Sequence, residues 1–109
     1  MNSCPRDTIA IFKRLTNMTP AEIRAWAKNP AAKRASFEAT RRRLPALADL
    51  TAKIRAGKPL SARECRYAQR VNNFNTRMSG MRRQWGCTDK IVIALRNWGH
   101  HPSGCPMPK

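Results

Sequence analysis

Acidic residues are scarce in this sequence of 109 residues. Six aspartates and glutamates stand against 22 lysines and arginines, so the formal net charge is +16 at pH 7. A chain with this charge repels itself unless something anionic neutralises it. We therefore expect an anionic partner, with nucleic acid favoured over an acidic protein and an anionic membrane surface.

Long apolar runs are also missing. No stretch approaches the roughly 18 residues that a membrane-spanning helix needs, and the first residues lack the pattern of a secretory signal. We expect no membrane partner and a cytoplasmic, nucleoid or nuclear location, not secretion. In such a compartment thiols stay reduced, and a chain with 41% hydrophobic residues can build a core without covalent links. Reduced thiols are accordingly expected at Cys4, Cys65, Cys87 and Cys105.

Strand-like alternation of apolar and polar residues is absent, whereas helical spacing recurs along the chain. The sequence predicts an all-α fold, a compact single-domain bundle of five or six helices around one long helix at about residues 62–85. Residues 1–99 would form the helical domain and 100–109 an irregular, proline-rich tail. Other helices are expected over 7–16, 31–44, from 44 until Gly57 and Pro59 close it, and from 89 until Gly99 ends the last one.

Two helix starts carry a capping-box pattern. Thr19 precedes Pro20 and has Glu22 three residues later, and Ser61 has Glu64 at the same offset. In this pattern the hydroxyl and the carboxylate each accept a hydrogen bond from a free backbone N–H group. The pattern predicts helices that begin at residues 20 and 62.

The long predicted helix carries two stripes. Its apolar residues recur at spacings of three and four, which places them on one narrow face that we expect to be the core: Tyr67, Val71, Phe74, Met78, Met81 and Trp85. A row of arginines lies about 80° around the same helix. Almost no acid is interleaved with these arginines, although a merely solvated face usually carries both signs.

Arginine is the more common cation here, and its planar guanidinium binds phosphate oxygens through two parallel hydrogen bonds. Consecutive arginines fan out around a helix, so only part of the run 41–43 can meet one backbone. The pair 82–83 also fits the negative end of the helix dipole. The predicted nucleic-acid-binding residues are Arg41, Arg42, Arg43, Arg63, Arg66, Arg70, Arg77, Arg82 and Arg83.

Catalytic constellations are not found. Asp7, Glu22, Glu64 and Asp89 each fall in the first turn of a predicted helix, where a carboxylate stabilises the helix end. No paired carboxylates and no nucleotide-binding or hydrolase motif remain. We predict no enzyme activity, no catalytic residue and no cofactor.

The stretch NWGHHPSGC near the end raises the question of a metal site. Cys87, His100 or His101, and Cys105 supply potential zinc ligands, with Cys4 as a fourth, yet no short-range ligand pair anchors the set. A helix that ends at Gly99, with both histidines near its negative end, explains the stretch better. No metal is predicted, although metal binding or cysteine pairing stays open from sequence.

Three segments, residues 12–26, 60–78 and 95–102, resemble a family of small, mostly bacterial proteins of unknown function that are often labelled DNA-binding. The family pattern opens with N-M-T-P-x-E-[LI]-x-x-W, continues with an arginine-rich helix and closes with W-G-H-D-P. His101 stands where the family has aspartate, and residues 83–90 look unlike it. The resemblance implies a DNA-binding role but no reaction.

Composition and motifs together predict a small basic protein that binds duplex DNA through phosphate contacts with little sequence specificity. A structural RNA-binding component of a ribonucleoprotein such as a ribosome is the first alternative. An interaction module for an acidic protein is the second. DNA is only weakly favoured over RNA, and neither a trusted helix-turn-helix nor RNA-binding aromatic motifs separate them.

Overall fold

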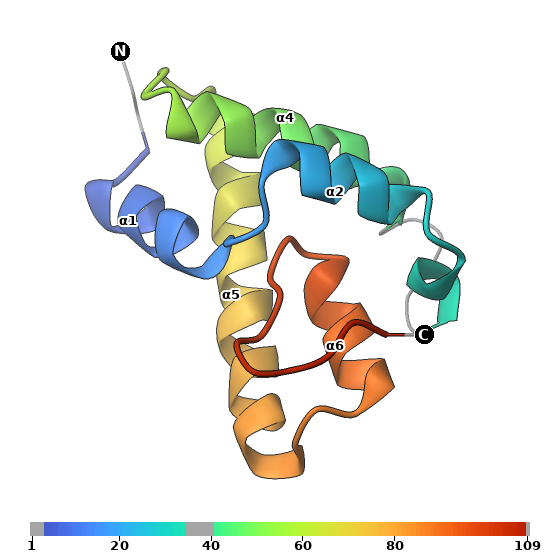
Figure 1. Cartoon of the computed structure of the whole chain (residues 1–109). Helices are drawn as coiled ribbons and strands as arrows, with labels where there is room; N and C mark the ends of the chain where they lie inside the picture. The colour runs from blue at the N-terminus through green and yellow to red at the C-terminus, as the bar shows by residue number, and fades with distance from the viewer. Residues whose placement is uncertain (1–3, 35–40, 109) are drawn as a thin grey trace.

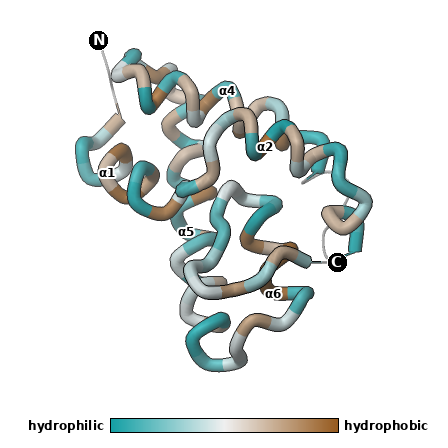
Figure 2. The backbone as a smooth tube through the Cα atoms, in the orientation of Figure 1, coloured by the Kyte–Doolittle hydropathy of each residue, from teal (hydrophilic) through white to brown (hydrophobic). Residues whose placement is uncertain are grey.

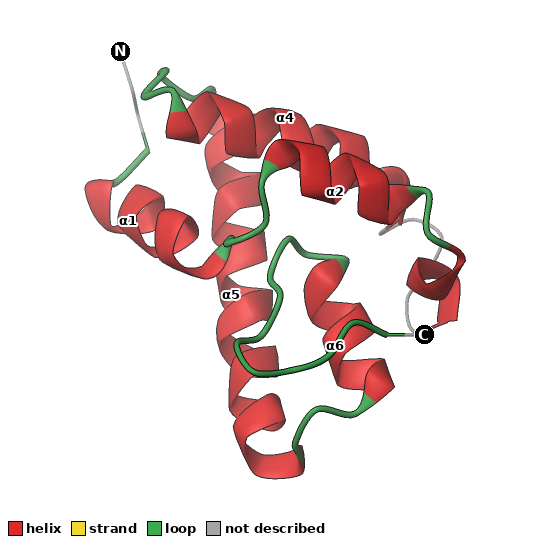
Figure 3. Cartoon of the chain, viewed as in Figure 1, coloured by secondary structure: helices red, strands yellow, loops and turns green. Residues whose placement is uncertain are grey.

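The computed structural model describes residues 4–34 and 41–108. These residues form an all-α bundle in which no strand occurs (Figure 3). In chain order the elements are α1 (Arg6–Leu15), α2 (Pro20–Ala27), the 3-10 helix η1 (Pro30–Arg34), α4 (Leu44–Arg55), α5 (Ala62–Trp85) and α6 (Asp89–Arg96). The all-α class and the long helix over 62–85 are confirmed. Within the described part of the chain, no helix is both long and apolar enough to cross a membrane.

Local signals place the helix starts as predicted. The Thr19 hydroxyl accepts from the Glu22 amide at 3.1 Å, and the Glu22 carboxylate accepts from the Thr19 amide at 2.8 Å. Ser61 and Glu64 form the same pair of bonds at 3.1 and 2.8 Å. Both capping boxes are confirmed. Of the third predicted helix, residues 31–34 belong to η1, residues 35–40 lie outside the described residues, and helical structure is described again at residues 41 and 42.

The helices pack in pairs around one core. Figure 1 shows α2 and α4 side by side, with α5 running from beneath α4 toward α6, and α1 packs against α5. Fully buried side chains from α1, α2, α4 and α6 fill the centre, among them Phe12, Trp26, Leu47 and Leu95. Figure 2 shows hydrophobic residues recurring along these helices, whereas the last turns of α5 are largely hydrophilic. The C-terminal end of α5 thus lies beyond the main core.

The buried face of α5 is not the predicted one. The buried residues are Cys65, Ala68, Val71, Asn72 and Asn75. Of the six apolar residues predicted as the core face, only Val71 is fully buried, and Met81 and Trp85 are 41% and 64% exposed. At 100° per residue, the observed face is rotated by about 100° from the expected apolar stripe.

Hydrogen bonds explain this rotation. The Asn72 side-chain amide donates to the Thr8 carbonyl at 3.0 Å, and that of Asn75 donates to the Trp98 carbonyl at 2.9 Å. Burial of an asparagine is tolerated when its polar atoms find such partners. The two residues tie α5 to α1 and to the turn after α6. A pattern that counts asparagine as polar assigns this face to solvent.

All four cysteines form disulfide bonds, so the expectation of reduced thiols is wrong. Cys4 pairs with Cys65 and Cys87 with Cys105, with Cα–Cα distances of 5.4 and 5.5 Å. The first bond fixes the start of the chain to α5, and the second fixes the loop after α5 to the C-terminal segment. In the loop-entropy model, sequence separations of 61 and 18 residues correspond to about 4 and about 3 kcal/mol of stabilisation.

The turn after α6 follows a Schellman motif. The amide of Gly99 donates to the Arg96 carbonyl, and that of His100 donates to the Leu95 carbonyl, both at 3.0 Å. Gly99 has a φ of +83°, and a Cβ there would lie 2.9 Å from Cγ2 of Thr16. Glycine is therefore required by conformation and by space. Beyond it, residues 100–108 are irregular, as predicted.

Candidate functional site

The arginines predicted on the long helix lie on its outer face. Arg63, Arg66, Arg70 and Arg77 are all exposed. At 100° per residue, the centre of this row is roughly 170° from the centre of the buried face. The row therefore projects away from the core, more fully than the sequence pattern suggested, because the core lies on the opposite side of α5.

Three of these arginines join a fourth in a pocket of about 610 Å³, which we call the arginine pocket. It is lined by Arg43, Ala46, Arg63, Arg66, Tyr67 and Arg70. The Tyr67 hydroxyl donates to the Arg43 carbonyl at 3.3 Å and so connects the start of α4 with α5. Four arginines from two regions of the chain, which are 20 or more residues apart, thus line one pocket together with a tyrosine.

The tyrosine of the pocket adds no negative charge to it. Burial raises the pKa of Tyr67 to about 12, against the opposing influence of Arg43 and Arg70, so the phenol stays neutral. Among the residues that the structure describes, no acidic side chain lines the pocket. A ligand that enters it meets four arginines and a tyrosine, which is an environment that an anion with an aromatic part prefers.

Four acids of the described segments are engaged elsewhere. The hydrogen bond from Lys53, together with the Ser61 amide, lowers the pKa of Glu64, so this carboxylate stays ionised and bound. The Thr19 amide likewise lowers the pKa of Glu22. Ion pairs use cations outside the arginine pocket: Arg24–Asp49 at 2.6 Å, Arg34–Asp89 at 3.9 Å and Lys53–Glu64 at 2.8 Å.

The structure brings only part of the predicted site together. Arg41 is half-buried and Arg42 is exposed just before α4, both have interaction partners, and neither lines the arginine pocket. Arg77 lies over the Phe74 ring, with 5.9 Å from its Cζ to the ring centroid. Arg82 donates to the Ser103 carbonyl at 2.6 Å and thereby holds the C-terminal segment, whereas Arg83 is exposed.

The histidines of the C-terminal stretch hold backbone in place. His100 Nδ1 contacts the Leu15 carbonyl at 2.5 Å, and burial lowers the pKa of this imidazole below 6.5. His101 Nδ1 accepts from the Arg96 guanidinium at 2.9 Å, because a guanidinium can only donate. Its Nε2 then carries the proton and donates to the Cys105 carbonyl at 2.9 Å.

Cys87 and Cys105 cannot provide thiolate ligands for zinc, because their sulfur atoms are bonded to each other. Across residues 4–34 and 41–108, no group of three or more potential metal ligands lies together. The histidines of the stretch NWGHHPSGC bind backbone carbonyls and connect the turn after α6 to the end of α1 and to Cys105.

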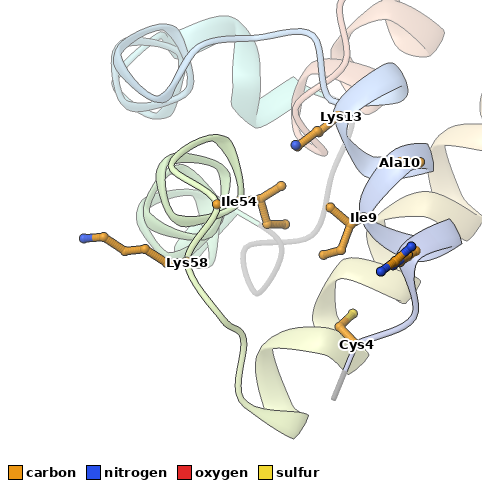
Figure 4. A pocket seen from close by; sticks show the side chains of 8 residues that line it. Cys4, Ile9, Ala10, Lys13, Ile54 and Lys58 are labelled. Carbon is orange, nitrogen blue, oxygen red and sulfur yellow. The ribbon is translucent and has the colours of Figure 1, made fainter. Parts of the chain in front are cut away.

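A second basic pocket was missed by sequence reasoning. A pocket of about 400 Å³ lies between α1 and the end of α4. In Figure 4, Ile9 and Ile54 face each other, Lys13 lies beside them, and Lys58 at the rim points away. Arg6 also lines it. Its two sides are more than 40 residues apart in the chain, so no local spacing could have indicated it. The charge of this protein is therefore spread over more than one face.

Comparison with known protein families, with curated proteins and with solved structures finds no match to this chain.

Proposed function

We propose that this protein binds nucleic acid through phosphate contacts, with duplex DNA as the favoured ligand and little dependence on base sequence. The observation that carries the proposal is the arginine pocket. Arg43, Arg63, Arg66 and Arg70 converge there, and no described carboxylate neutralises them. Cations that have no acidic neighbours repel one another, and a polyanion relieves that repulsion.

The spacing of the arginines suits a phosphate backbone. Residues 63 and 77 are about 21 Å apart along α5 at 1.5 Å per residue. This length corresponds to roughly six base pairs of B-DNA at 3.4 Å per pair. Arg77 therefore extends the contact surface along α5 beyond the pocket. Each guanidinium can bind two oxygen atoms of one phosphate.

Phosphate contacts position a protein but carry no direct sequence information. The arginines lie on the outer face of α5, and the opposite face packs against the core. This geometry favours binding to the phosphate backbone of the nucleic acid. The resemblance to a family labelled DNA-binding agrees with this proposal. RNA in a ribonucleoprotein and an acidic protein are the competing ligands.

The test is the salt dependence of binding, measured by fluorescence anisotropy with a labelled 20-base-pair duplex of two unrelated sequences. About five phosphate contacts predict a slope of log K against log salt of roughly −4 to −5, equal for both sequences. A slope near zero would refute phosphate binding. Tighter binding to a structured RNA, or to an acidic protein, at equal salt would assign the surface to one of the competing ligands.

A further inference from the structure

The C-terminal end of α5 carries an exposed apolar surface. Trp85 is 64% and Met81 41% exposed, and we call these two residues the α5 tip. At helical spacing they continue the line of Phe74 and Met78, which are half-buried against the fold. A large aromatic side chain with most of its surface in water is the kind of feature that marks a binding site.

Cations lie close to the α5 tip in the sequence. Arg82 and Arg83 precede Trp85, and Lys90 follows in the first turn of α6. At 100° per residue Arg82 is about 60° from Trp85 around the helix, whereas Arg83 lies on the opposite side. The acid nearest to Trp85 in the sequence, Asp89, forms an ion pair with Arg34 at 3.9 Å. An apolar surface with a cation beside it matches a partner that combines a flat ring with negative charge.

This surface continues the arginine row. Arg77 lies over Phe74, and the Phe74 ring stacks on Trp98 with 4.7 Å between centroids. One side of α5 thus carries the arginine row and, beside it, the apolar line from Phe74 to Trp85. Surfaces that bind single-stranded nucleic acid combine the same two elements, cations along the backbone and aromatic rings under the bases.

The backbone that carries the α5 tip is tied to the C-terminal segment. The Gly86 amide donates to the Arg82 carbonyl at 2.8 Å and closes the last turn of the helix. The next residue, Cys87, is bonded to the buried Cys105, and Arg82 binds the Ser103 carbonyl. This backbone therefore loses little freedom when a base stacks on the indole.

We propose that Trp85, supported by Met81, stacks against an unpaired base of a nucleic acid whose phosphates occupy the arginine pocket. The inference rests on the proposed function and adds a ligand class: duplexes with a single-stranded extension. Trp85 lies eight residues beyond Arg77, or about 12 Å along α5. This distance equals three to four nucleotide steps at 3.4 Å, so an extension must have about four nucleotides to reach the indole.

The experiment compares affinities of a blunt 16-base-pair duplex and of the same duplex with thymine extensions of one and six nucleotides on the 3′ or 5′ strand. For the unaltered protein we expect one six-nucleotide extension to tighten binding about tenfold and the one-nucleotide extension to have no effect. A six-unit abasic extension keeps the phosphates and removes the bases. It should give less than a third of that gain.

The matched protein variant is Trp85→Ala, with Trp85→Phe as the conservative form. Alanine should abolish the gain and leave blunt-duplex affinity within about twofold, and phenylalanine should retain part of it. Thermal melts check folding, which an exposed side chain should hardly affect. A gain that persists in Trp85→Ala or with abasic extensions would overturn the inference and assign the effect to charge.

Other results separate the two proposals. Blunt duplex bound with the expected salt slope but no gain from any extension would refute the role of Trp85 and leave phosphate binding intact. Failure to bind any duplex would refute both. A blue shift of Trp85 fluorescence on anionic phospholipid vesicles, lost in Trp85→Phe and without an extension effect, would assign the α5 tip to a lipid surface instead.

Discussion

Replacing the α5 arginines of the pocket tests whether position or total charge drives binding. The variant Arg63→Gln, Arg66→Gln, Arg70→Gln removes three exposed guanidinium groups from one pocket. The control Arg14→Gln, Lys28→Gln, Arg55→Gln removes three exposed cations from α1, from the end of α2 and from α4. Both variants lower the net charge by three, so long-range attraction weakens equally.

Counterion release gives the size of the effect. Three lost phosphate contacts flatten the slope of log K against log salt by about 2.7, which at 0.1 M salt corresponds to roughly 500-fold weaker binding. The control should flatten it by less than about 1. Stability should change little, because all six side chains are exposed and removal of like charges relieves repulsion.

The assay is anisotropy with a 20-base-pair duplex from about 0.05 to 0.3 M salt, with thermal melts on the same preparations. Equal slopes for the two triple variants would refute the reasoning, since binding would then follow net charge and not the arginine pocket.

Three further predictions concern the fold. Without reductant, iodoacetamide should add no mass to the native protein, and ready alkylation would contradict the disulfides. Replacing both cysteines of Cys4–Cys65 by alanine should lower the free energy of unfolding by about 4 kcal/mol, and the same change at Cys87–Cys105 by about 3 kcal/mol. The folded pKa of His100 lies below the unfolded value of about 6.5, so the unfolded chain takes up the proton first and stability falls as pH drops below about 6.5. His100→Gln should flatten the dependence of the melting temperature between pH 7 and 5, before Glu22 and Glu64 begin to titrate, and an unchanged profile would exclude this group. Asn97→Ala leaves the buried Trp26 Nε1, now 2.7 Å from Asn97 Oδ1, without its acceptor and should cost about 1–3 kcal/mol in urea unfolding; a smaller loss would mean that water replaces the amide.

The sequence predicted the elements well where local chemistry decides them. Both capping boxes, the glycine at the end of α6 and the bounds of α5 depend on neighbours within a few residues. The buried face of α5 was predicted wrongly. Asn72 and Asn75 can be buried there because their side chains donate hydrogen bonds to carbonyls more than 20 residues away in the sequence. Tertiary contacts of that kind leave no periodic signal.

The candidate site was predicted in composition but not in shape. The arginine row on α5 was visible from spacing, whereas the contribution of Arg43 depends on how α4 packs beside Tyr67. The disulfides were missed because the composition was interpreted as that of a reducing compartment. The exposure of Trp85 was missed for the same reason as the rotation of α5: spacing alone placed it in the core.

The most direct measurement of the central claim is arginine protection. The protein is treated with phenylglyoxal alone and with saturating 20-base-pair duplex at low salt, and modification is mapped by mass spectrometry. Arg43, Arg63, Arg66 and Arg70 should become at least fivefold less reactive in the complex, while Arg14 and Arg55 keep their reactivity. Equal protection of all these arginines, or protection confined to Arg14 and Arg55, would contradict the arginine pocket as the nucleic-acid-binding surface.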